Sequence, residues 1–140
     1  MTRTPPNPAG YSGTPLPKKL GIKPGSMVAL VGAPRDFRRT LGPLPERARL
    51  RAGAGKACTL TLWFTRSRKD LKQGIKRMAR QAAQGPVWIL WPKQASGLAT
   101  DLGGQVVSEA GLAAGLVDYK VCAVDATWSG LVFARRKQRN

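Results

Sequence analysis

Residues 85–101 contain the feature that most strongly limits how this chain can fold. Residues 87–91 are all apolar, with β-branched and aromatic members, and a proline stands directly on each side of them. An apolar run without alternation is typical of a strand that is covered on both faces, as in a parallel sheet. The sequence therefore predicts an α/β protein with this run near the centre of a three-layer structure.

Other segments alternate between strand-like and helix-like patterns. We expect strands at residues 27–31, 58–64, 87–91, 119–124 and 131–134. Helices are expected at 16–20, near 35–41, from 67 to about 83 and from 100 to about 114, with irregular chain up to residue 57. Helices between strands favour parallel pairing, and the last two strands have the pattern of a hairpin. The prediction is a mainly parallel sheet of about five strands with a C-terminal antiparallel hairpin.

The length of 140 residues is typical of one domain. We expect a flexible N-terminal arm at 1–14, a single α/β domain at 15–134 and a basic tail at 135–140. The first residues lack an apolar signal core, and no apolar stretch is long enough to cross a bilayer. These features predict a cytoplasmic protein that does not bind membranes.

The charge balance is strongly basic, with 24 Lys and Arg against 7 Asp and Glu. Such an excess favours a polyanionic partner, either an anionic small molecule or nucleic acid, although it can also belong to a solvated surface. The chain has no histidine, so a Ser-His or Cys-His nucleophile is excluded. Its two cysteines, Cys58 and Cys122, lie in strand-like runs as reduced hydrophobic residues, and we expect no metal site.

Polar residues follow the strand ends that should share one edge of the sheet. Lys93 and Arg66 are candidates to hold an anion, and the helix that begins after Ser67 would add backbone donors. Trp128 could stack on a base, and Asp101 and Asp125 are the carboxylates available for acid/base chemistry. The full set of candidate ligand-binding residues is Arg66, Ser67, Lys93, Ser96, Thr100, Asp101, Asp125, Trp128 and Ser129.

Each of these side chains also has a structural interpretation. Asp125 would cap its own turn, and Asp101 would lie in the first turn of the helix capped by Thr100. Trp91 ends a buried strand and fits the core better than a ligand site. Trp128 could simply cover the hairpin. The basic stripe of Lys69, Lys72, Lys76 and Arg80 is typical of a solvated helix face.

Three long stretches of this chain resemble the bacterial domain-of-unknown-function family 3052. They are GYSGTPLPKKLGIKPG at 10–25, WPKQASGLATDL at 91–102 and VDYKVCAVDATWSG at 117–130. The C-terminal half also resembles a class I methyltransferase-like Rossmann fold, through the Gly-Pro turn before residue 87 and the final strand inserted antiparallel. These resemblances imply a truncated fold of that kind, with the five expected strands in the order first, second, third, fifth, fourth, and they bring no established activity.

The chain departs from working methyltransferases where their cofactor binds. After the first strand it has GAPRDF at 32–37, with a single glycine and with Pro34, which lacks a backbone donor. No acidic residue is placed to end a second strand and hold ribose hydroxyls. We therefore expect no S-adenosylmethionine and no other cofactor. Two functions follow as hypotheses: a non-catalytic module that binds an anion, or a small enzyme that uses Lys93 with Asp101 or Asp125.

Overall fold

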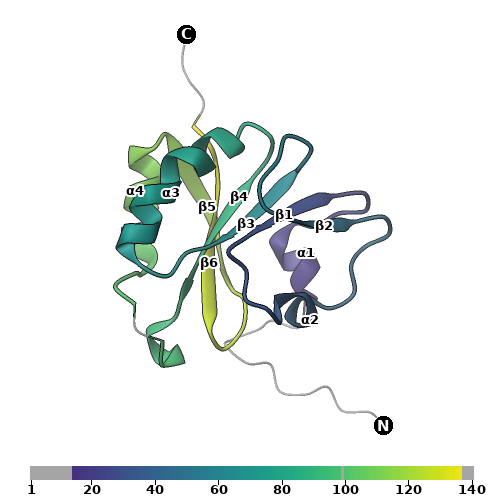
Figure 1. The fold of residues 1–140 in the computed structure, drawn as a ribbon, viewed down its shortest axis with the longest axis horizontal. Helices are drawn as coiled ribbons and strands as arrows, with labels where there is room; N and C mark the ends of the chain where they lie inside the picture. Colours follow the sequence, from purple (N-terminus) through teal and green to yellow (C-terminus); the bar gives the residue numbers. More distant parts are fainter. Residues whose placement is uncertain (1–13, 99, 137–140) are drawn as a thin grey trace.

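The computed structural model describes residues 14–98 and 100–136, and within them six strands form one sheet (Figure 1). The elements are α1 (Leu16–Leu20), β1 (Met27–Val31), α2 (Phe37–Leu41), β2 (Arg49–Ala52), β3 (Leu60–Phe64), α3 (Arg68–Gln81), β4 (Val87–Pro92), the 3-10 helix η2 (Gln94–Ser96), α4 (Gly104–Ala113), β5 (Leu116–Ala123) and β6 (Trp128–Arg135). The strand order is β2-β1-β3-β4-β6-β5. Strands β2, β1, β3 and β4 are parallel, and β6 is antiparallel to both β4 and β5. The predicted order of the five expected strands is confirmed.

Strand β2 was not expected, because residues 42–57 were predicted to be irregular. It pairs in parallel with β1, with Val28 opposite Leu50. Leu50 is its one side chain that packs, partly buried, against the core, while Arg49 and Arg51 are exposed. A four-residue strand with a single apolar side chain carries almost no pattern in the sequence. Its backbone pairing with β1 holds it at the edge of the sheet.

Helices cover both faces of the sheet, as a three-layer structure requires. One hydrophobic cluster joins α1 and α2 to the sheet and includes Leu20, Phe37 and Trp88. Another joins α3 and α4 to the opposite face and includes Met78 and Val107. Figure 1 shows α3 and α4 together on one side of the strands, and α1 with α2 on the other. The central strand β4 is buried along its whole length, as its continuous apolar run predicted.

Helix α1 is short, and two local features fix it against the sheet. Gly21 ends it in the left-handed conformation, with φ 86°, that glycine adopts without a steric cost. The indole Nε1 of Trp88 in β4 donates a hydrogen bond of 2.8 Å to the carbonyl of Leu20. Because this donor is buried, the bond both satisfies the indole and fixes the end of α1 over β4.

Helix α4 begins later than the sequence predicted. Its N-cap is Gly103 rather than Thr100, and Val107 and Gly111 are the residues that it buries. Ala113, the last residue of the helix, is exposed. No helix in the described ranges is both long and apolar enough to span a bilayer.

Candidate functional site

The two polar motifs that follow β4 and β5 meet at the carboxyl edge of the sheet, as the topology predicted. Pro92 lies opposite Trp128 in the β4–β6 ladder, and the backbone N–H of Lys93 donates to the carbonyl of Thr127 at 2.7 Å. The turn before β6 therefore lies directly beside the start of the loop that leaves β4. Residues more than thirty positions apart in the sequence form one continuous edge.

Within this edge, Lys93 is bound to the chain itself. Its Nζ donates to the carbonyl of Asp125 at 2.7 Å in a partly buried position. The carboxylate of Asp125 accepts from the backbone N–H groups of Thr127 and Trp128, each at 2.8 Å. Asp125 therefore caps its own turn, as its structural interpretation from the sequence predicted. Ser96 Oγ donates to the carbonyl of Lys93 at 2.6 Å and so closes η2 against the strand end.

The N-terminus of α3 was expected to offer backbone donors to an anion, and two of these N–H groups are bonded within the protein. The N–H of Asp70 donates to Ser67 Oγ at 3.1 Å, and the N–H of Arg68 donates to the Asp101 carboxylate at 2.8 Å. Arg68 Nε also donates to the carbonyl of Asp101 at 3.1 Å. A carboxylate from the loop before α4 thus occupies the position proposed for a ligand. Asp101 caps α3 and not the helix that follows it in the sequence.

Thr100 and Ser129, two further candidate ligand-binding residues, are held by contacts within the protein. Thr100 Oγ1 donates to the carbonyl of Arg66 at 3.1 Å and accepts from the N–H of Leu102 at 3.1 Å. Ser129 is a residue of β6, opposite Trp91 in the ladder. The loop after β4 is therefore joined to the loop after β3 by contacts that need no ligand.

Trp128 is a core residue and not an exposed platform for a base. It is 4% exposed, and its ring packs edge-on against Phe64, with 5.0 Å between the ring centres. The guanidinium of Arg66 lies 5.2 Å from the centre of the Trp128 ring. The predicted stacking role is corrected because Trp128 is the first residue of β6 and its side chain is buried in the hydrophobic cluster that also contains Phe64.

Gly32, at the end of β1, is needed for packing between strands. Its φ is 71°, and a Cβ at this position would lie 2.9 Å from the carbonyl oxygen of Phe64 and 3.7 Å from a terminal nitrogen of Arg66. The glycine therefore allows β3 and the Arg66 side chain to approach β1. In methyltransferases the glycines after the first strand serve the approach of a ligand; here the neighbour is the protein itself.

A basic depression that the sequence did not predict lies beside this glycine, where β1 and β2 end. It has a volume of about 470 Å³ and is lined by residues from the β1–α2 loop, from the end of β2 and from α3. Three exposed arginines contribute to its wall: Arg35, Arg38 and Arg77. We call it the arginine pocket. The described residues that line it include no carboxylate.

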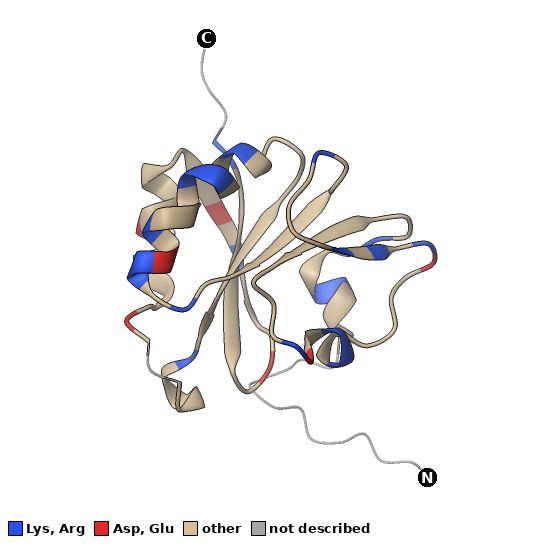
Figure 2. Cartoon of the chain, viewed as in Figure 1, with Lys and Arg blue, Asp and Glu red and all other residues tan. Residues whose placement is uncertain are grey.

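Sequence reasoning missed this pocket for a clear reason. Six arginines between positions 35 and 51 were visible, but without β2 they had no place in the fold. Arg77 comes from α3, next to the basic stripe, and nothing in the helical pattern separates it from that stripe. Figure 2 shows Lys and Arg on α2, β2 and α3, with few acidic residues between them.

Comparisons with known proteins find a likeness to a solved structure and no family. No family model matches the chain, and no curated protein matches it. Among solved structures, it is similar to a SAM-dependent methyltransferase from Aquifex aeolicus, at 12% identity and a TM-score of 0.49. That match covers 83% of this chain and 85% of the other. Membership of family 3052 stays a prediction.

Proposed function

We propose that this protein is a non-catalytic binding module for a phosphate-bearing anion, which it holds in the arginine pocket. The main support for this proposal is that Arg35, Arg38 and Arg77 line one depression at the carboxyl ends of β1 and β2. Ligands of open α/β sheets bind outside these strand ends, where connections leave toward opposite faces. Here the chain leaves β1 toward α2 on one face and leaves β3 toward α3 on the other.

The side chains match phosphate chemistry in kind as well as in charge. A guanidinium presents several N–H donors in a planar fork that fits phosphate oxygens bidentately. Arg35 lies in the β1–α2 loop, Arg38 in α2 and Arg77 in α3. An anion bound by all three would therefore also link α2 to α3. The chain as a whole has 17 more cationic than acidic side chains, which steers anions toward such a surface.

The hypothesis of a small enzyme has weaker support at the edge of the sheet. Lys93 Nζ is bound to a backbone carbonyl, and the carboxylates of Asp101 and Asp125 accept backbone N–H groups. A general acid or base must be able to reach a substrate proton. These three groups instead hold the loops together, which favours binding without catalysis.

The first test is calorimetric titration with pyrophosphate. The double variant R35Q/R77Q should bind it at least about tenfold more weakly, since each lost hydrogen bond to a charged group contributes about 1.5–3 kcal/mol. The matched control K72Q/K76Q removes the same charge from the exposed face of α3 and should stay within about twofold. Lys93→Ala should also leave the affinity unchanged. If both double variants weakened pyrophosphate binding equally, or if Lys93→Ala weakened it, the proposal that the arginine pocket binds the anion would be refuted.

The proposal also excludes S-adenosylmethionine as a ligand. The missing side chain of Gly32 makes room for the Phe64 carbonyl and for Arg66, and Ala52 and Gly53 stand at the end of β2, so no acidic residue is placed there to hold ribose hydroxyls. The same calorimetric titration with S-adenosylmethionine should give no saturable heat. A micromolar dissociation constant for this compound would contradict the proposal.

A further inference from the structure

A second depression lies at the amino edge of the sheet, away from the arginine pocket. Its wall includes Ser26, Thr59 and Pro86, which directly precede β1, β3 and β4, together with residues of β5 and β6. It has a volume of about 380 Å³, within the range of small-molecule sites. This depression is separate from the predicted ligand site at the carboxyl edge of the sheet and from the arginine pocket.

The floor of this depression is apolar and rigid. Leu60, Trp88 and Val132 are all buried strand residues of the face beneath α1. The Trp88 indole is fixed by its 2.8 Å bond to the Leu20 carbonyl. A flat apolar molecule would therefore meet a preformed surface and would not have to order the side chains beneath it.

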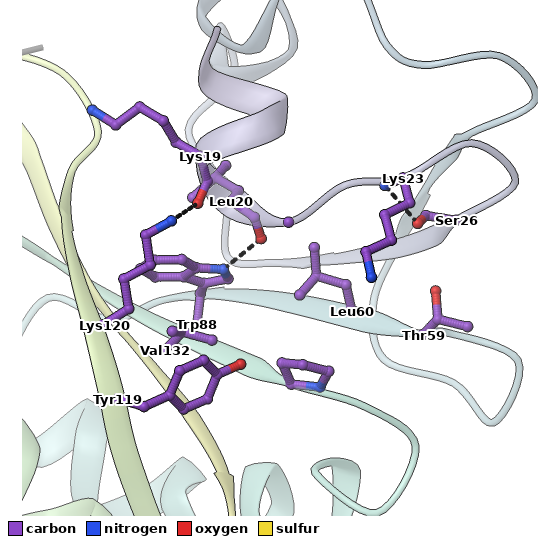
Figure 3. A pocket seen from close by; sticks show the side chains of 12 residues that line it. Lys19, Leu20, Lys23, Ser26, Thr59, Leu60, Trp88, Tyr119, Lys120 and Val132 are labelled. Atoms are coloured by element: carbon purple, nitrogen blue, oxygen red, sulfur yellow. Dashed lines mark hydrogen bonds between the residues drawn. The ribbon is translucent and has the colours of Figure 1, made fainter. Parts of the chain in front are cut away.

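The mouth carries an ammonium group and a phenol. Figure 3 shows Lys23 on one side of the space and Tyr119 on the other, with Leu60 between them. Within the described chain, the structure records no partner for the Nζ of Lys23. Tyr119 is 59% exposed, which is unusual for a large aromatic side chain on a strand. We call this site the lysine–tyrosine pocket.

The neighbouring groups keep the mouth cationic and ordered. Lys120 Nζ donates to the carbonyl of Lys19 at 3.0 Å, and the N–H of Lys23 donates to Ser26 Oγ at 3.0 Å. Partial burial raises the pKa of the Tyr119 phenol above its usual value, so at neutral pH its hydroxyl is a proton donor. The described lining residues include no acid. All of these groups favour an anionic end on the ligand.

We propose that the lysine–tyrosine pocket binds an aromatic carboxylate. Its ring would pack beside Tyr119 above the apolar floor, and its carboxylate would accept from Lys23 Nζ. A single ammonium suits a carboxylate, whereas the three guanidinium forks of the arginine pocket suit a phosphate. The two sites are independent, because they share none of the residues that line them.

The probe for the test is 2-naphthoate, followed by ¹H–¹⁵N NMR of the full chain. The indole N–H resonance of Trp88 should shift saturably, because this group lies in the floor of the pocket. The neutral analogue 2-naphthamide should bind at least about tenfold more weakly, since it lacks the charge that Lys23 pairs with.

Variants at the mouth separate this site from general attraction to a basic protein. Lys23→Gln and Tyr119→Ala should each raise the dissociation constant for 2-naphthoate by about tenfold. Lys18→Gln is the matched control, because Lys18 is exposed on α1 and does not line the pocket. The R35Q/R77Q variant should bind 2-naphthoate normally. Equal affinity for the neutral analogue, or no effect of Lys23→Gln, would overturn the proposal.

Discussion

Gly111 lies in the last turn of α4, and its missing side chain leaves room for the ring of Phe133. A Cβ at this position would overlap that ring, which is fully buried and has no space to move. Gly74 in α3 has the same relation to Trp63. Glycines weaken a helix prediction because they are poor helix formers. Here each one lets a helix approach an aromatic residue of the sheet.

Gly111→Ala should therefore destabilise the protein, although alanine favours helix formation by about 1 kcal/mol. Forcing a methyl group into a packed core costs about 1–3 kcal/mol, and the buried ring cannot relieve the overlap. Gly104→Ala in the same helix is the control, since its Cβ would stand 3.8 Å from Trp91, an ordinary contact. Urea unfolding should show a loss for the first variant and no loss for the second. Similar midpoints for both would contradict this packing.

Thr65 is the residue at which a polar group is buried at a cost. Its side chain is 1% exposed, and among the described residues its Oγ1 has no hydrogen-bond partner. Thr65→Val should keep or raise the free energy of unfolding, by up to about 1 kcal/mol, because an unsatisfied hydroxyl is removed. Thr59→Val is the opposite case, since its hydroxyl bonds to the backbone of Met27 at 3.3–3.4 Å. The midpoint temperature of thermal unfolding should stay the same or rise for Thr65→Val, and it should fall for Thr59→Val.

At the scale of elements, Asp101 joins the loop before α4 to the N-terminus of α3. Its carboxylate accepts the N–H of Arg68, the first residue of α3, and the Arg68 side chain returns a bond to its carbonyl. Asp101→Ala should cost about 0.5–2 kcal/mol, the usual contribution of an N-terminal cap. Asp101→Asn should cost less, because its amide oxygen still accepts.

Glu109→Ala is the charge-matched control for Asp101→Ala. Glu109 is exposed on α4 and accepts a bond from Gln105 one turn earlier. Its removal should change the free energy of unfolding by less than about 0.5 kcal/mol. Chemical denaturation of the three variants measures the difference. If Glu109→Ala lowered the free energy of unfolding as much as Asp101→Ala, the effect would come from the lost charge and not from the lost cap.

The sequence predicted elements well and the roles of polar side chains poorly. The continuous apolar run of β4 and the helix-strand alternation predicted five of the strands, and the resemblance to a methyltransferase-like fold supplied their correct order. Strand β2 was missed because only Leu50 in it contacts the core. The convergence of the two motifs followed from strand direction. That Lys93 would bind the Asp125 carbonyl, and Asp101 the N–H of Arg68, depends on contacts more than thirty residues apart.

At the scale of the whole molecule, the excess charge is distributed over more surface than either pocket uses. Of the 24 cationic side chains, three described arginines line the arginine pocket, and three described lysines, Lys19, Lys23 and Lys120, line the other. Lys69, Lys72 and Lys76 are exposed along α3 and line neither depression. A basic surface of this kind attracts any polyanion. Binding of nucleic acid alone therefore does not identify a site, and its salt dependence is the quantity to measure.

The salt dependence of binding to a fluorescent single-stranded oligonucleotide separates the arginine pocket from the general surface. Each phosphate neutralised on a single strand contributes about −0.7 to the slope of log K against log salt. Three arginines predict a slope of about −2, and R35Q/R77Q should reduce it to about −0.7. K72Q/K76Q should leave the slope near −2. A slope steeper than about −5 that responds equally to both double variants would mean that the strand binds the whole basic surface. The pocket would then have no special part in nucleic-acid binding, while the pyrophosphate titration would still report whether it binds a small anion.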